Sequence, residues 1–584
     1  MSKQYDLVIR GGLVVDGTGE EPFVADVAVK DGRIAFVGPD AGAGAEEIDA
    51  GGRIVTPGFV DVHTHYDGQA IWSNRLSPSS SHGVTTVVAG NCGVGFAPCR
   101  TEDHARLISV MEGVEDIPGV VMADGLPWDW ETFPEYLDAL DARARDIDIA
   151  VYLPHSPLRV YVMGERGAQR EPATGEDLAK MRSLVREAVE AGALGVATSR
   201  VLFHRTSAGD MIPSYDAGYS EIDALTGGLA DAGSGIFQIV LDLPQQGWRE
   251  TLEPLVATVA QSGRPATFTL GAGNDGPPTW REALDTVSEA NAKGHPISAQ
   301  VLPRPVGLLA GLDLSINPFC LCPSFAAIAN LPHDEKLAAL RDPAVRSRLL
   351  TETPEEGHPL AMISRRWEWM FPFAGTPRYD PSPESSIAAI AKARGLSPEE
   401  VAYDCLLEDD GHAFLFNALG NFHEGRMDAI HEMLSHPHAI LGLGDGGAHY
   451  GSICDASYPT FFLTYWMRDN EGSGFSLPRA IRMLSHDPAR AVGLLDRGLL
   501  RPGYKADLNV IDLDRLTLHM PVIRNDLPAG GRRLDQEATG YVATIVSGTV
   551  IRRDDTPGAD LPGRLVRGAK AAPQTADAAQ AVPA

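Results

Sequence analysis

Apolar residues in the middle of the chain recur as short, nearly continuous runs. Such runs are typical of parallel strands that are buried on both faces. Segments with helical periodicity, such as 174–191 and 278–293, separate several of the runs. The alternation predicts an α/β fold, a closed (β/α)8 barrel of the TIM type. Its eight expected strands are residues 59–62, 84–89, 147–153, 194–198, 236–241, 266–270, 297–301 and 440–443.

The two ends of the chain contain short β-rich runs that are interrupted by glycine, and Ser547-Gly548 is a hairpin signal. We expect residues 1–55 and 498–555 to build one small β-sandwich domain, with the barrel in 56–497. A long excursion at about 303–438 is predicted to hold helices of its own, as a lid or subdomain. Residues 563–584 are rich in Ala, Pro and Gln, which favours a disordered tail.

The charge balance excludes several classes of partner. Lys and Arg number 49 against 78 Asp and Glu, so the net charge is −29 and a nucleic-acid partner is not expected. Neither a signal peptide nor a membrane span is predicted. Six scattered cysteines indicate reduced thiols. The expectation is a cytoplasmic protein that acts on a small molecule and that could form a homo-oligomer.

A His-x-His pair directly follows the first predicted barrel strand. His63 and His65 are two residues apart on an extended segment, so both imidazoles can reach one metal ion. The carboxyl ends of barrel strands are also where such folds place their chemistry. A second pair, His436 and His438, precedes the eighth strand and is therefore expected to be structural.

Two further candidate ligands follow the second and the eighth strand. Cys92 lies between Gly90 and Gly93, and a thiol beside a divalent cation becomes a good ligand. The alternative for Cys92 is a small buried apolar residue. Asp445 stands among glycines, where it can bind the metal and accept a proton from water. Its alternative role is that of a turn residue.

Several basic residues at the same rim are candidates for substrate binding. Arg200, His204 and Arg205 follow the fourth strand, and an arginine fork suits a substrate carboxylate. Ion pairs with the abundant acids are the alternative. His155 ends the third strand and His449 follows Asp445, and each is a candidate for substrate contact or for a structural role.

Four motifs in chain order resemble the amidohydrolase superfamily. They are Val-Thr-Pro-Gly-Phe-Val-Asp-Val-His-Thr-His at 55–65, Gly-Val-Thr-Thr-Val-Val-Ala-Gly-Asn-Cys-Gly at 83–93, Gly-Leu-Gly-Asp at 442–445 and Pro-Gly-Tyr-Lys-Ala-Asp-Leu at 502–508. The Gly-Asn-Cys-Gly signature is similar to that of the N-acyl-D-amino-acid deacylases. The resemblance implies a metal-dependent hydrolase with His63, His65 and Cys92 as zinc ligands. It also implies that Asp445 is both ligand and general base, and that the substrates are N-acyl-D-amino acids.

The chain departs from this family pattern on two strands. The family places a metal-binding histidine at the ends of the fifth and sixth strands, but residues 235–242 and 265–271 contain none. Gln238 is a much poorer zinc ligand and becomes a candidate for substrate contact instead. We therefore expect one zinc ion, held by His63, His65 and Asp445, with Cys92 available as a fourth ligand.

These residues together predict hydrolysis of a non-peptide C–N bond. Arg200 or Arg205 would anchor the carboxylate of an N-acyl-D-amino acid. One alternative keeps the chemistry but takes a cyclic amide, imide or lactone as substrate. Another alternative, suggested by the missing histidines, is a metal-poor barrel that binds a ligand without hydrolysing it.

Overall fold

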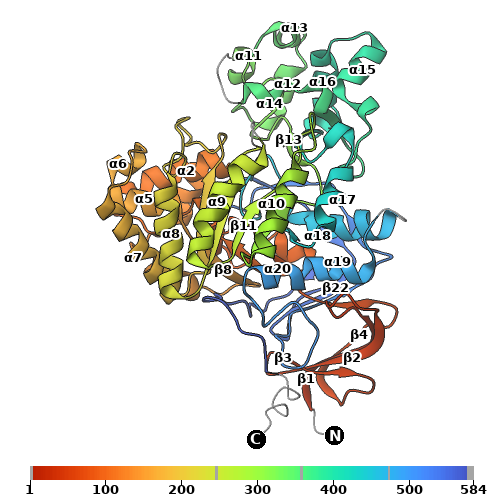
Figure 1. Ribbon diagram of the computed structural model, residues 1–584. Coiled ribbons are helices and arrows are strands. Elements are labelled where there is room, and N and C mark those ends of the chain that lie inside the picture. The colour runs from red at the N-terminus through yellow and green to blue at the C-terminus, as the bar shows by residue number, and fades with distance from the viewer. Residues whose placement is uncertain (1–3, 244–246, 355–359, 471–473, 575–584) are drawn as a thin grey trace, which may run out of the picture.

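A sheet of eight parallel strands forms the centre of the molecule (Figure 1). The computed structural model describes residues 4–243, 247–354, 360–470 and 474–574. The strands follow one another in chain order around the sheet, so the predicted barrel is confirmed. They are β6 (Phe59–Asp61), β7 (Val84–Ala89), β8 (Asp148–Pro154), β9 (Gly195–Arg200), β10 (Ile236–Leu241), β11 (Ala266–Thr269), β12 (Ile297–Val301) and β16 (Ala439–Leu441).

Backbone hydrogen bonds join the segments that follow the first and the last barrel strand. The N–H of His65 donates to the carbonyl of Gly446 at 2.8 Å, and the N–H of Asp445 donates to the carbonyl of His63 at 3.1 Å. These bonds close the sheet at the carboxyl ends of its strands. The two chain segments that carry the predicted metal ligands are thereby fixed against each other.

The helices that cover the barrel follow from amphipathic sequence and clear end signals. In α7 (Gly175–Ala191), Thr174 and Asp177 form a capping box, while Met181 and Val185 are buried. Burial of each such side chain contributes about 1.5–3 kcal/mol. The other barrel helices are α1 (Gln69–Trp72), α2 (His104–Glu115), α3 (Gly119–Gly125), α4 (Phe133–Asp141), α5 (His155–Met163), α6 (Glu165–Ala168), α8 (Tyr219–Ala232), α9 (Trp248–Ser262), α10 (Trp280–Ala292), α17 (Asp428–Ser435), α18 (Tyr458–Phe461), α19 (Leu477–Leu484) and α20 (His486–Ala491).

Strands from both ends of the chain share one nine-stranded sheet. Strand β5 pairs with β17 in antiparallel fashion, and this pairing joins the N-terminal to the C-terminal strands. The strands are β1 (Tyr5–Val14), β2 (Phe23–Lys30), β3 (Arg33–Gly38), β4 (Gly44–Asp49), β5 (Ile54–Pro57), β17 (Leu508–Ile511), β22 (Tyr541–Val546), β23 (Thr549–Arg553) and β24 (Thr556–Pro557). Figure 1 shows this sheet below the barrel. Short two-stranded pairs, β18 (Thr517–Leu518) with β21 (Ala538–Thr539) and β19 (Val522–Arg524) with β20 (Arg533–Asp535), complete the C-terminal part.

The excursion between β12 and β16 forms a unit with its own apolar core, and Figure 1 shows it at the end of the barrel opposite the nine-stranded sheet. The antiparallel strands β13 (Val306–Ala310), β14 (Met370–Phe373) and β15 (Phe414–Gly420) make up its sheet. Its helices are α11 (Pro323–Ala326), α12 (His333–Leu340), α13 (Pro343–Thr351), α14 (Ala361–Ser364), α15 (Ile387–Arg394) and α16 (Pro398–Leu406). Phe319, Leu349 and Leu415 are among its buried core residues.

The first part of the predicted disordered tail is ordered. The N–H of Val566 donates to the carbonyl of Ile149 at 2.7 Å, and Leu565 and Val566 are buried. The expectation of disorder was therefore wrong for this segment. Leu565, Val566 and the backbone hydrogen bonds hold it along β8, and the average composition of residues 563–584 does not reveal these contacts. Residues 575–584 lie outside the described residues. Every helix in the described ranges is too short or too polar to cross a bilayer.

Candidate metal centre

His63 and His65 leave β6 side by side, and both are only 1% exposed. Their ring centroids lie 5.5 Å apart. The intervening Thr64 is tied to the neighbouring strand, because its N–H and its hydroxyl both donate to the carbonyl of Val88. The segment is thus held on both sides, and the two imidazoles have little freedom to separate.

A glutamine fixes the orientation of His63. The Nδ1 of His63 lies 2.8 Å from Oε1 of Gln300, and Nε2 of Gln300 donates to Thr267 at 3.0 Å. Because a carbonyl oxygen only accepts, Nδ1 must carry the proton, which leaves the lone pair of Nε2 free for a ligand. Burial lowers the pKa of His63 to about 4, so the ring is neutral near pH 7.

Cys92 faces the same two imidazoles. Its Sγ lies 3.6 Å from Nε2 of His63 and 3.8 Å from Nε2 of His65. Gly90 and Gly93 both have positive φ, and a Cβ on either would fall within 2.4–2.6 Å of the backbone of β8 or β9. The glycines therefore let this loop press against the strands. Burial raises the pKa of the Cys92 thiol to about 12, so the thiolate needs a neighbouring cation to form.

Asp445 completes the group from the segment that follows β16, which is bonded to the segment after β6. Its Oδ1 lies 3.6 Å from Nε2 of His63 and 3.7 Å from Nε2 of His65. Burial would raise the pKa of Asp445, but His65 and His63 outweigh it and lower that pKa below its usual range. The carboxylate is therefore ionised at neutral pH. Its Oδ1 is buried without a hydrogen-bond partner among the described residues.

The donor set fits a divalent cation. Ligand atoms around a tetrahedral zinc ion lie about 3.3–3.6 Å from one another. The ligand atoms of His63, His65 and Cys92 lie within 4.8 Å of one another, and Oδ1 of Asp445 lies 3.6–3.7 Å from the two imidazole nitrogens. Two imidazole nitrogens, a thiol and an unpartnered carboxylate oxygen are also the chemistry that zinc prefers. The predicted convergence of these side chains is thus present in the structure.

A buried glutamate that no sequence motif indicated lies against this group. Glu115 ends α2, and its Oε1 lies 3.3 Å from Nδ1 of His65. Its Oε2 lies 3.6 Å from Nε2 of His449, and the N–H of His449 donates to the Glu115 carbonyl. Glu115 lies at the end of a helix, 23 residues after Cys92, so no short spacing in the sequence connects it with the ligands.

His449 and His204 also lie close to the metal centre. The ring of His449 is 6.5 Å from that of His65, and its side chain is partly exposed. Nδ1 of His204 lies 2.8 Å from the hydroxyl of Ser199. Burial and the neighbouring His65 lower the pKa of His204 to about 3, so this ring is neutral. Both histidines are therefore neighbours of His65, and their contact with a substrate stays a prediction.

Arg200 at the end of β9 and Arg205 in the loop that follows both bond to nearby backbone carbonyls. Arg200 donates to the carbonyl of Ala217 at 2.5 Å and stacks over Tyr219 at 4.8 Å. Arg205 donates to the carbonyls of Leu202 and Gly209. Neither guanidinium bonds to any of the four donors, so the role of Arg200 and Arg205 in substrate binding stays a prediction.

The remaining candidates are separated by their partners. Both nitrogens of the fully buried His155 are occupied, by Thr198 and Glu221 at 2.8 Å each, which corrects the expectation of substrate contact. The amide of Gln238 on β10 is buried, and neither of its polar atoms has a partner among the described residues. At the other end of the barrel, His436 lies 2.8 Å from Ser288, consistent with a structural role.

Comparisons with known proteins agree with this geometry. The family model described as "Amidohydrolase family" matches residues 46–552. The chain is 28% identical to a D-aminoacylase of Alcaligenes xylosoxydans xylosoxydans over 515 residues, which cover 88% of this chain and 89% of the relative. It is 28% identical to an N-acyl-D-glutamate deacylase of the same organism over 579 residues, 97% of each chain. The crystal structure of N-acyl-D-glutamate deacylase from Bordetella bronchiseptica, complexed with zinc and a phosphonate inhibitor, shares the fold with a TM-score of 0.64 at 22% identity, covering 97% of this chain and 100% of that one.

Proposed function

Because the chain belongs to the amidohydrolase family, we propose that it is a metal-dependent hydrolase that cleaves the C–N amide bond of an N-acyl-D-amino acid. The observation that carries the proposal is the convergence of His63, His65, Cys92 and Asp445 at the carboxyl ends of the barrel strands. The substrate class is supported by the two curated deacylases that align with nearly the whole chain.

The proposal assigns one zinc ion to these four side chains. His63 presents Nε2 because Gln300 occupies its Nδ1, and Cys92 would bind as the thiolate. A bound zinc ion would supply Lewis-acid chemistry, polarising the scissile carbonyl and making water a stronger acid. Gln238 replaces the histidine that the family carries on the fifth strand, which favours one ion over two.

Asp445 is the proposed general base and acid. As an ionised carboxylate beside the ligand atoms of His63 and His65, it can accept a proton from the attacking water and then deliver it to the departing amine nitrogen. Its side chain is 18% exposed, whereas those of His63 and His65 are 1% exposed. The carboxylate therefore borders the space through which substrate and water arrive.

The remaining polar groups would orient the substrate. His449 and the neutral His204 lie beside the centre and offer hydrogen bonds to the amide or to the carboxylate of the substrate. Arg200, the last residue of β9, and Arg205, next to His204 in the following loop, are the proposed partners of the substrate carboxylate. The unpartnered amide of Gln238 is a further candidate contact.

Amine release from a panel of N-acetyl-D-amino acids tests the proposal. The zinc-loaded wild type is expected to release amine, and Asp445→Asn should lower kcat by about 10²–10⁴-fold because it cannot accept the proton. The exposed Asp223→Asn on α8 is a matched control that should behave as wild type.

Two outcomes would replace the proposal by its alternatives. Ring opening of a cyclic amide, imide or lactone without amine release from the linear panel would assign the cyclic substrate class. Less than about half an equivalent of zinc after purification, with no turnover on adding metal, would indicate a binding module.

A further inference from the structure

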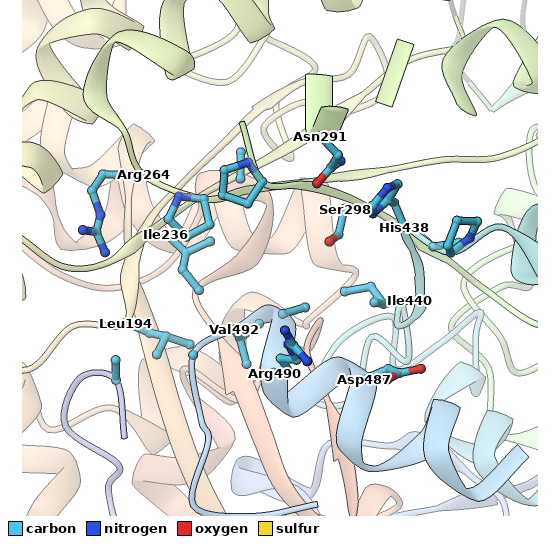
Figure 2. A pocket seen from close by; sticks show the side chains of 18 of the residues that line it. Leu194, Ile236, Arg264, Asn291, Ser298, His438, Ile440, Asp487, Arg490 and Val492 are labelled. Carbon is cyan, nitrogen blue, oxygen red and sulfur yellow. The ribbon is translucent and has the colours of Figure 1, made fainter. Parts of the chain in front are cut away.

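A cavity lies at the opposite end of the barrel from the metal centre. It has a volume of about 570 Å³, and Leu194, Ile236, Ala266 and Ala439 line it at the amino ends of β9, β10, β11 and β16. The helices α19 and α20 form another wall (Figure 2). A cavity of this size can hold a small organic molecule.

Arginines dominate the charge of this cavity. Arg264, Arg479, Arg482 and Arg490 line it, and Asp487 is the acid among its lining residues. Arg482 donates to Asp487 at 2.9 Å and so neutralises it. The excess of positive charge stands out in a chain with a net charge of −29.

Three of the arginines are incompletely satisfied by the protein. Nε of Arg479 is buried and has no hydrogen-bond partner within the described part of the chain. Arg264 donates to the carbonyls of Gly233 and Gly235 but forms no ion pair with a described residue, and burial lowers its pKa. Arg490 enters from α20, as Figure 2 shows, and it too has no acidic partner among the described residues. Burial of Arg479 Nε and partial burial of Arg264 without an anion are costly, and a bound anion would offset that cost, while the exposed Arg490 adds positive charge at the opening.

We propose that this cavity binds a small molecule that carries two or more phosphate or carboxylate groups. Arg264 and Arg490 reach it from different elements, so their forks can bind separate anionic groups. Ile236 and Val492 supply apolar surface for the uncharged part of the ligand. The site is distinct from the metal centre, and the proposal does not depend on the hydrolase function.

Titration calorimetry of the full-length protein with pyrophosphate and, separately, with citrate tests this site at low salt. Binding of one equivalent of either probe is expected, and the tighter probe identifies phosphate or carboxylate as the preferred group. The double variant Arg479→Gln/Arg490→Gln should bind at least about tenfold more weakly, since it removes two charged hydrogen-bond donors.

Two controls keep the result specific to the cavity. Arg186→Gln/Arg249→Gln removes two arginines from α7 and α9 that pair with exposed acids, and it should leave binding unchanged. Both probes can also chelate zinc at the metal centre, but chelation would be the same in the double variant and in the wild type.

A folding failure of the double variant would not end the test. Arg490 is exposed, so Arg490→Glu should fold and should weaken binding by more than about tenfold through charge reversal. The proposal is overturned if neither probe binds the wild type at about 1 mM, a concentration far above that needed for a specific site. Equal binding by the wild type and by a folded arginine variant would overturn it as well.

Discussion

Glu115→Gln tests the reasoning about the metal centre most directly. The substitution keeps the shape of the side chain and removes its charge. Two unit charges 3.3 Å apart, the distance from Glu115 Oε1 to His65 Nδ1, interact by about 5 kcal/mol at an effective dielectric constant of about 20. Zinc binding requires a neutral imidazole, which carries only part of a charge, so about 1.4–2.7 kcal/mol is expected, the equivalent of the 10–100-fold that such neighbours contribute to metal affinity.

This contribution should appear as metal affinity. Glu115 makes His65 a better electron donor and holds its ring, and such contacts are typically worth about 10–100-fold in binding. Competition between the apo protein and a zinc-chelating dye measures the affinity of each variant. The exposed Glu190→Gln on α7, whose pair with Arg186 lies on the surface, should bind zinc like the wild type.

Apo stability separates a loss of affinity from a loss of structure. Burial raises the pKa of Glu115, so the ionised carboxylate is unfavourable in the apo protein. The Glu115→Gln substitution should therefore not lower the unfolding temperature of the apo protein. Weaker zinc binding with unchanged apo stability is therefore the expected pair of results. Zinc affinity within about twofold of wild type in a folded Glu115→Gln protein would refute the positioning role, since the loss expected for such a contact is at least about tenfold.

Three further predictions concern a proposed ligand, a glycine beside it and a buried charge at the amino end of β8. Cys92→Ala should lower zinc affinity more than Glu115→Gln does, because it removes a ligand atom; equal zinc retention after dialysis would show that Cys92 is only a buried apolar residue. Gly90→Ala should destabilise the protein by more than about 2 kcal/mol in urea unfolding, since the new Cβ would lie 2.4 Å from the carbonyl of Tyr152 at φ +80°. Burial alone would raise the pKa of Asp148, but Lys505 and Arg497 lower it to about 2. This depressed pKa means that the ionised form stabilises the fold above about pH 4 and that the stabilisation is lost as the pH falls toward 2. The stability difference between wild type and Asp148→Asn should narrow by about 1 kcal/mol between pH 5 and pH 3; a constant difference would contradict the assignment.

The barrel was predictable because its strands are apolar on both faces and leave a continuous signal in the sequence. The three-stranded sheet of the excursion was not, since β14 (Met370–Phe373) contains a proline and pairs only with the distant β15. The ordered structure of residues 563–570 was also not predictable from the sequence, because it depends on backbone hydrogen bonds to the distant strand β8.

The residues of the metal centre likewise divide into those that the sequence indicated and those that only the structure shows. His63, His65, Cys92 and Asp445 directly follow barrel strands, and strand ends converge by topology. Glu115 and Gln300 are set by packing between elements far apart in sequence, so no local pattern reveals them. His155 also follows a strand, yet its ring is turned into a bond with Glu221, which only the structure shows.

The excursion between β12 and β16 begins beside the centre, where Gln300 of β12 contacts His63, but it supplies none of the four donors. The helices α11, α12, α13, α15 and α16 pack around a core of their own, whereas β13, β14 and β15 also pack into the core of the barrel. The outer helices of a related enzyme could therefore replace those of this chain while the strands that contact the barrel stay unchanged. Diversification of such enzymes toward new substrates has, in this architecture, a segment that can vary on its own.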